Sequence, residues 1–136
     1  MAEITKITIT KNPGYGCSSH SFQEKITLTV NSIDYKLIPH MHNKEEEERQ
    51  WSYKSNKPLM RDIIKEAFEE LGKIIWMDDE VRCYDIGSIE FIITYSDKTK
   101  IKKTFWRPAT DFRRGFVAIR DLVPGLENIP RLLDFH

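Results

Sequence analysis

The clearest pattern of apolar and polar positions lies in the last third of the chain and predicts a β-hairpin. Residues 89–95 and 99–105 both carry large apolar side chains at alternate positions. A turn of three residues, 96–98, sets Ile93 opposite Ile101 and keeps one face of the hairpin apolar. A two-residue turn would instead mix apolar positions with lysines on that face. We therefore predict two strands joined by a three-residue turn.

A second hairpin is predicted closer to the start of the chain. Residues 22–30 alternate between apolar and polar side chains, and the alternation resumes after Asn31 and Ser32. A two-residue turn at these positions sets Val30 opposite Ile33. Such turns require positive φ angles, which asparagine tolerates better than most residues. We therefore expect Asn31 to adopt a positive φ.

Helical spacing replaces alternation in the middle of the chain. A helix is expected from Pro58 to about Met77, with Ser55 or Asn56 as the residue that caps its first turn. The apolar positions expected to face the core of the protein are Leu59, Ile63, Phe68, Leu71 and Ile75.

A second amphipathic helix follows the hairpin of the last third. Thr110 is expected to cap this helix, and Pro124 with Gly125 to end it. Its apolar side comprises Phe112, Phe116, Ile119 and Leu122. Gly115 lies inside the helix, where glycine costs about 1 kcal/mol relative to alanine. Either close packing at this point or simple tolerance explains the glycine.

Two shorter strands complete the predicted fold. Residues 4–10 are rich in Ile and Thr and are expected to pair with residues 22–30, while Trp51 and Tyr53 indicate a brief strand before the first helix. Residues 40–49 have no regular spacing of apolar side chains that could hold them to a core, and this predicts a mobile loop. The order β-β-β-β-α-β-β-α predicts an α+β fold, in which an antiparallel sheet of about five to six strands carries both helices on one face.

Length and charge restrict the class of protein. A chain of 136 residues is expected to form a single domain over residues 1–136, with a core that needs no metal or disulfide. The 21 basic and 21 acidic residues balance, so the chain has no excess positive charge of the kind expected in a dedicated nucleic-acid or membrane-surface binder. Cys17 and Cys83 have no metal-type spacing, and no signal peptide is visible. A reduced, cytoplasmic protein without a cofactor is expected.

Two histidines are weak candidates for metal ligands. His40 and His42 are two positions apart, so on an extended strand their side chains would point the same way. Acidic residues at 45–48 and 78–80 would complete a carboxylate shell of the kind a metal-dependent hydrolase needs. The alternative is a solvated acidic run that contacts a basic partner.

A basic stretch in the last third is a candidate nucleic-acid interface. Its members are Lys100, Lys102, Trp106, Arg113 and Arg114. Lysines and a tryptophan on an outward sheet face resemble surfaces that track phosphates and stack on bases. The alternative is an edge strand whose lysines prevent aggregation, and the balanced net charge favours this alternative.

Aromatic and acidic residues near position 50 form a candidate surface for binding another protein. Its members are Trp51, Tyr53, Glu45, Glu46, Glu47 and Glu48. Protein interfaces concentrate aromatic side chains, and a two-layer domain has limited room to bury them. The apolar residues at 129–135 either add to this exposed surface or cross the helices and complete the core.

Part of the chain resembles a group of small uncharacterised bacterial proteins. The resemblance lies in residues 95–100, 104–108, 111–112 and 122–125, about the last third of the chain. These motifs are structural rather than catalytic, so the resemblance implies no activity. The turn in that group typically reads Ser-Asp-Gly-Thr, and here Lys98 replaces the glycine. Because the last residue of a three-residue turn usually adopts a left-handed conformation, the lysine is expected to strain the turn.

The sequence contains no coherent active site, and this decides the order of the functional hypotheses. The leading hypothesis is a non-enzymatic regulator or inhibitor of bacterial or phage origin that binds a protein or ribonucleoprotein. A nucleic-acid binder is the first alternative, and a metal-dependent hydrolase is the second. No membrane association is expected, and the sequence leaves the oligomeric state open.

Overall fold

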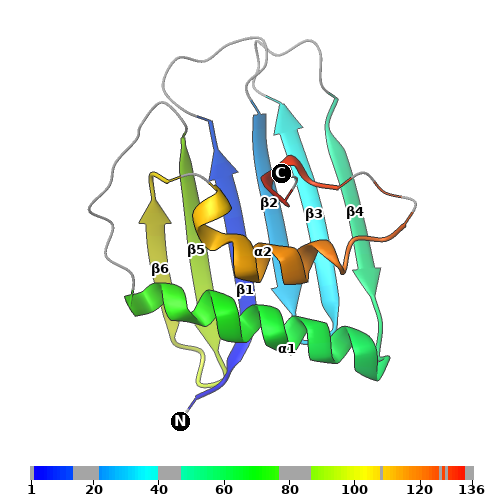
Figure 1. Ribbon diagram of the computed structural model, residues 1–136, viewed down its shortest axis with the longest axis vertical. Coiled ribbons are helices and arrows are strands. Elements are labelled where there is room, and N and C mark those ends of the chain that lie inside the picture. Colours follow the sequence, from blue (N-terminus) through cyan, green and yellow to red (C-terminus); the bar gives the residue numbers. More distant parts are fainter. Residues whose placement is uncertain are drawn as a thin grey trace.

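The protein is an α+β domain in which two helices cross one face of a six-stranded antiparallel sheet, as the sequence predicted (Figure 1). The computed structural model describes residues 2–13, 22–39, 47–76, 87–107, 109–125, 127 and 129–133. Its elements are β1 (Ile4–Asn12), β2 (Phe22–Thr29), β3 (Ser32–Pro39), β4 (Arg49–Lys54), α1 (Pro58–Gly72), the 3-10 turn Lys73–Trp76, β5 (Ser88–Tyr95), β6 (Lys100–Phe105), the 3-10 turn Ala109–Phe112, α2 (Arg113–Arg120) and the 3-10 turn Arg131–Leu133.

The strand order in the sheet is β4-β3-β2-β1-β5-β6. The first strand, β1, therefore lies in the middle, where it pairs with β2 on one side and with β5 on the other. Strands β4 and β6 form the two edges of the sheet. Both α1 and α2 cover one face of the sheet, and none of the described helices lies on the opposite face (Figure 1).

The predicted hairpin of the last third is confirmed in its register and its turn. Ile93 pairs with Ile101 and Ile89 with Phe105, as a three-residue turn requires. Lys98 adopts a φ of 70° and donates its backbone N–H to the carbonyl of Tyr95 at 2.9 Å. The lysine therefore occupies the left-handed conformation that favours glycine.

The hairpin between β2 and β3 exists, but its predicted register is wrong. Leu28, not Val30, pairs with Ile33, so the turn consists of Val30 and Asn31. Among the described residues, Lys98 is the only non-glycine with positive φ, so the expected positive φ of Asn31 is also wrong. A register shift of two residues keeps every side chain on its original face, which is why the pattern of burial alone does not distinguish the two registers.

The first helix begins at Pro58 as predicted, but Lys57 and not Ser55 or Asn56 is its N-cap residue. Its buried face is rotated from the predicted one. The buried side chains are Met60, Ile64, Ala67, Phe68 and Leu71, whereas Leu59 is 71% exposed. The pattern is ambiguous because Ile63 and Ile64 are adjacent, and the helix buries the second of them more completely. The predicted end near Met77 is wrong, because the α-helix ends at Gly72 and the 3-10 turn Lys73–Trp76 follows it. The side chain of Ile75 lies outside the described residues.

The second helix has the predicted apolar side, but it differs from the prediction in its start and ends at Arg120, before Pro124 and Gly125. Phe112, Phe116, Ile119 and Leu122 are buried as expected. The helix is preceded by a 3-10 turn, and its N-cap is Phe112 rather than Thr110. A β-carbon on Gly115 would lie 2.5 Å from Cδ2 of Leu71 on α1. Of the two explanations for this glycine, close packing is therefore the correct one.

The core lies between the sheet and the helices. Four aromatic rings from both layers meet there, with centroids 5.0–6.2 Å apart: Phe91, Phe105, Phe112 and Phe116. Leu132 and Leu133 are also buried, so this part of the tail completes the core and adds no exposed surface. Residues 40–46 of the expected loop lie outside the described residues. Arg49 does not belong to a loop, because it pairs with Leu37 as the first residue of β4.

Candidate protein-binding edge

The two edges of the sheet differ in how they are protected. Strand β6 carries Lys100, Lys102 and Lys103 among its six residues, and charged side chains on an edge discourage pairing with other chains. Strand β4 has the sequence RQWSYK, with Arg49 and Lys54 at its ends and four uncharged residues between them. The middle of β4 therefore lacks this protection.

The backbone groups that β4 presents outward follow from its pairing with β3. Ser55, just beyond the strand, donates its N–H to the carbonyl of Asn31 at 3.0 Å. Because backbone groups alternate in direction along an antiparallel ladder, the N–H and C=O of Gln50, Ser52 and Lys54 point away from β3. These groups form a template on which another strand can pair.

The aromatic residues of β4 face the helix side of the sheet. Trp51 is half-buried and stacks on Tyr35 of β3, with ring centroids 5.3 Å apart and planes inclined by 28°. Tyr53 is 42% exposed. Trp51 thus anchors the edge strand to the core, while Tyr53 provides apolar surface that a partner can cover.

Of the four glutamates in the predicted partner-binding set, the structure describes two. Glu47 and Glu48 are exposed immediately before β4, and Glu48 lies 3.6 Å from Nζ of Lys36. Glu45 and Glu46 lie outside the described residues. The structure therefore brings Trp51, Tyr53 and the last two glutamates together along one edge.

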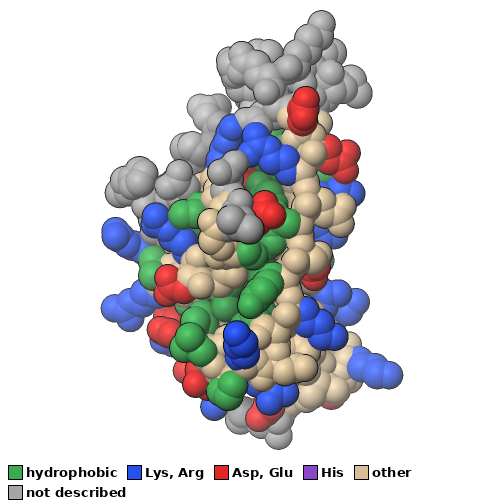
Figure 2. Space-filling model, turned by 90° about the vertical axis from the view of Figure 1, so that its right-hand side faces the viewer, with side chains coloured by type: hydrophobic (Ala, Val, Ile, Leu, Met, Phe, Trp, Pro, Cys, Tyr) green, Lys and Arg blue, Asp and Glu red, His purple; other side chains and the backbone are tan. Residues whose placement is uncertain are grey.

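Next to Trp51 lies a space of about 260 Å³ between β3, β4 and the tail of the chain. Its lining residues are Tyr35, Leu37, Arg49, Trp51, Glu127, Ile129 and Arg131. Figure 2 looks onto the β4 edge and shows hydrophobic side chains in a strip between the sheet and the helix layer. A strand added to β4 would place alternate side chains over this strip.

A buried carboxylate that the sequence reading missed lies behind this edge. Glu24 on β2 is fully buried and accepts hydrogen bonds from the Tyr35 hydroxyl at 2.5 Å and from the backbone N–H groups of Arg131 and Leu132 at 2.9 and 2.8 Å. It attaches the tail to the sheet. The signal was present in the alternation, because residue 24 has the same parity as the inward-facing Ile26.

The pKa values of two neighbours of Glu24 are shifted from their ordinary values. Burial raises the pKa of Tyr35 above its ordinary range, and the hydrogen bond to Glu24 adds to the shift. Lys11 is paired with Glu24 in the β1–β2 register. Burial lowers the pKa of Lys11, and the attraction of Glu24 partly opposes this change. Both groups are therefore held in a partly dehydrated site next to a buried acid.

The predicted basic face is not one surface. Lys100 and Lys102 lie on the open face of β6, where Lys102 is 3.4 Å from Glu90. Arg113 and Arg114 begin α2 and so belong to the helix layer. Trp106 follows β6 and is half-buried. The open face instead gathers lysines from five strands: Lys6, Lys25, Lys36, Lys54, Lys100 and Lys102.

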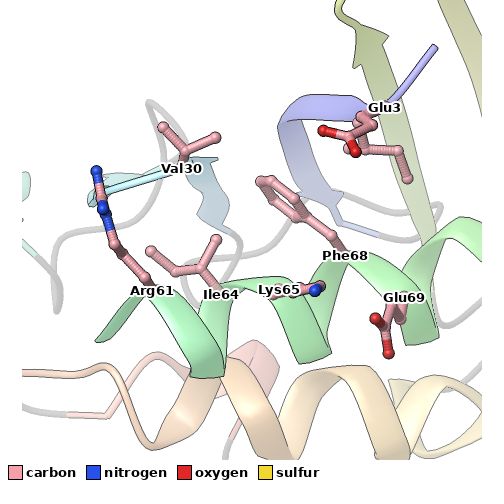
Figure 3. Close-up of a pocket in the computed structure, with 8 residues that line it drawn as sticks. Glu3, Val30, Arg61, Ile64, Lys65, Phe68 and Glu69 are labelled. Atoms are coloured by element: carbon pink, nitrogen blue, oxygen red, sulfur yellow. The ribbon is translucent and has the colours of Figure 1, made fainter. Parts of the chain in front are cut away.

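A groove of about 520 Å³ lies between α1, the start of β1 and the β2–β3 turn. Figure 3 shows Ile64 and Phe68 along its apolar floor, with Arg61 toward one end and Glu3 and Glu69 toward the other. The sequence reading missed this groove because its residues come from three separate segments. Its charged lining residues are Glu3, Arg61, Lys65 and Glu69, so the groove presents charges of both signs beside an apolar floor.

The metal hypothesis rests on residues that the structure does not describe. His40 and His42 lie outside the described residues. In the part of the chain that is described, no three His, Cys, Asp or Glu side chains come together in a way that would hold a metal ion. Neither α1 nor any other described helix has the length and apolar content to cross a membrane.

Comparison of the chain with models of known protein families and with curated protein sequences gave no match. The function of this chain is therefore inferred from its own geometry.

Proposed function

We propose that this chain is a non-enzymatic, protein-binding regulator, such as a small inhibitor of bacterial or phage origin, that pairs its β4 edge with an extended segment of a larger partner. The observation that carries the proposal is the unprotected middle of β4, from Gln50 to Tyr53, in a sheet whose other edge carries three lysines. In strand addition, backbone hydrogen bonds provide affinity and the pockets for alternate side chains provide specificity.

The surroundings of β4 supply both parts of this binding mode. Within the part of the chain that the structure describes, no strand pairs with the outward N–H and C=O groups of Gln50 and Ser52, so these groups can form a ladder with an added strand. Tyr53 is exposed on the helix side, and the space next to Trp51 accommodates a side chain of the added strand. Tyrosine and tryptophan are over-represented among the residues that dominate interface energies.

Proline at the edge tests the proposal without disturbing the fold. Ser52→Pro removes an N–H that points away from β3, and edge strands tolerate proline at such positions. Lys102→Pro is the matched control on β6, because Tyr95 pairs with Thr99 and the same alternation directs the Lys102 N–H outward. Both variants should retain cooperative unfolding.

The experiment is affinity capture from the native host with the wild type and both variants, followed by titration of the captured protein in purified form. We expect Ser52→Pro to weaken binding at least tenfold and Lys102→Pro to leave it within about twofold. A purified partner that binds the wild type and Ser52→Pro equally well would contradict the proposal.

A second candidate function is nucleic-acid binding through the open face of the sheet. The open face carries six lysines and three acidic residues, Asp34, Glu48 and Glu90, although the whole chain is neutral. A surface of this kind contacts phosphates, and each lost contact lowers the slope of log K against log salt by about one. The zero net charge gives no long-range attraction, which is why this candidate ranks second.

Fluorescence anisotropy with short single- and double-stranded probes at low salt tests this second candidate. Lys100→Ala with Lys102→Ala should lower the salt slope by about two, and Trp106→Ala should cost about 1–3 kcal/mol only if its ring stacks on a base. Lys65→Ala on α1 is the control, because it lies in the opposite layer. Absence of binding at low salt, or equal effects of all these variants, would remove the candidate.

A further inference from the structure

The sequence of the β4 edge is complementary to itself in one antiparallel register. We propose that β4 pairs with β4 of a second copy of this chain, with Trp51 opposite Trp51 at a two-fold axis perpendicular to the sheet. Such an axis keeps the helix-covered faces of both copies on the same side, so residues that face each other across the axis lie on matching faces.

The charges at the two ends of the strand favour this register. With Trp51 opposite itself, Glu48 lies opposite Lys54 of the second copy, and the symmetry repeats this ion pair at the other end. The Glu48 side chain is 60% exposed and Lys54 is exposed, so both are accessible. Opposite charges directly across an antiparallel pair stabilise it, and like charges destabilise it.

The uncharged positions match in the same register. Gln50 lies opposite Ser52 of the second copy, and these are the residues whose backbone groups point outward. On the helix side, Arg49 lies opposite Tyr53, an arrangement suited to a cation–π contact. Moving the register by two residues in either direction, to place Gln50 or Ser52 opposite itself, separates Glu48 from Lys54 and removes both ion pairs.

Strand β6 does not have this property. Pairing β6 with itself about Ile101 places Lys100 opposite Lys102, and pairing about Lys102 or Lys103 places each of these lysines opposite its own copy. Like charges in direct opposition oppose pairing. The zero net charge of the whole chain adds no long-range repulsion between copies. Pairing between two copies of the chain is therefore expected at β4 and not at β6.

Dimerisation would regulate the binding edge, because the second copy and an extended partner segment use the same backbone groups. Only this regulatory consequence rests on the proposed function, whereas the dimer itself does not. The free protein would protect its edge as a dimer and release it at low concentration or on competition with a partner.

Two single charge reversals test the dimer. Glu48→Lys gives an edge with lysine at both ends, and Lys54→Glu gives one with glutamate at both ends. Each variant alone should self-associate at least tenfold more weakly than the wild type in sedimentation equilibrium. Mixed in equal amounts, the two variants should form a heterodimer with an affinity within a few-fold of the wild type, because every pair is again of opposite charge.

A control variant tests whether the effect is specific to β4, and disulfide formation tests the register of the dimer. Lys102→Glu on the other edge should leave the association unchanged, and thermal unfolding checks that each variant is folded. In a Cys17→Ser, Cys83→Ser background, Gln50→Cys and Ser52→Cys chains should form a disulfide when mixed under mild oxidation and only weakly when kept apart.

A wild type that stays monomeric at several hundred micromolar, or a mixture of charge variants that does not associate, would overturn the dimer. If a partner still binds in a manner sensitive to Ser52→Pro, the proposed function survives that result. A dimer that forms as described while no partner depends on β4 would overturn the proposed function alone.

Discussion

Tyr35 on β3 donates its hydroxyl hydrogen to the fully buried carboxylate of Glu24 on β2, across 2.5 Å. The same carboxylate accepts the backbone N–H groups of Arg131 and Leu132. A buried charge that is fully hydrogen-bonded is tolerated, and loss of its partners exposes the cost of its burial. Glu24 therefore connects the sheet to the tail that completes the core.

Replacing this carboxylate should destabilise the protein strongly. Glu24→Gln keeps the shape but turns an amide N–H₂ group toward hydrogen-bond donors, so we expect a loss of about 3 kcal/mol in the free energy of unfolding. Urea denaturation measures this change. Glu69→Gln, on the exposed side of α1, is the control and should cost less than about 0.5 kcal/mol. A loss below about 1 kcal/mol for Glu24→Gln would contradict the role assigned to this residue.

The raised pKa of Tyr35 predicts a loss of stability in alkali. Above the ordinary value of 10.0, an unfolded chain releases the Tyr35 proton while the folded chain retains it, so the free energy of unfolding falls as pH rises. By pH 11 this contribution amounts to about 1.4 kcal/mol. We expect Tyr35→Phe to remove it, although the variant is less stable at neutral pH.

Urea denaturation of the wild type and Tyr35→Phe at pH 8 and pH 11 measures this difference. Lys11 contributes in the opposite direction, because its lowered pKa makes stability rise with pH up to its ordinary value of 10.5. Comparing the two proteins cancels this contribution, since both contain Lys11. Equal alkaline losses in both proteins would show that Tyr35 ionises normally in the folded state.

Gly115→Ala should destabilise the protein although alanine is the better helix former. The new β-carbon would lie 2.5 Å from Cδ2 and 2.7 Å from Cγ of Leu71, and overpacking of this kind costs about 1–3 kcal/mol. Gly125→Ala is the control, because its β-carbon would meet nothing within 4 Å. Thermal unfolding of both variants checks the prediction. A stabilised Gly115→Ala protein would mean that the helices separate without cost.

Lys98→Gly should stabilise the turn between β5 and β6. Lys98 has a φ of 70°, and a left-handed conformation costs a residue with a side chain about 1 kcal/mol relative to glycine. We expect a gain of about 0.5–1 kcal/mol in the free energy of unfolding. Lys98→Ala separates this effect from the loss of charge, because alanine keeps the unfavourable conformation. A gain of similar size in both variants would attribute the effect to charge.

The sequence predicts those features that depend on the parity of side chains. The β5–β6 hairpin is correct to the residue, because only one turn length keeps Ile93 and Ile101 on the same face. The α+β class follows from the same alternation combined with two helical stretches. Parity does not distinguish registers that differ by two residues, and for this reason the turn at Val30 and Asn31 was misplaced.

Features that depend on long-range packing could not be predicted from the sequence. The rotation of α1 is set by which of two adjacent isoleucines meets the sheet, and the partner of Gly115 is a leucine on the other helix. The role of Glu24 depends on amide groups more than one hundred positions away. In the candidate site, the aromatic residues of β4 were visible in the sequence, whereas its place at an edge of the sheet depends on the complete strand order.

The central place of β1 has a consequence for synthesis in the cell. Thr5 of β1 contacts Thr94 of β5, 89 positions later in the chain. During synthesis, the side of β1 that pairs with β5 therefore has no partner until β5 leaves the ribosome. A nine-residue strand that is unpaired on one side, and whose isoleucines are buried only in the folded protein, is a site for aggregation. Chaperones that shield nascent chains should therefore matter more for this protein than its small size suggests.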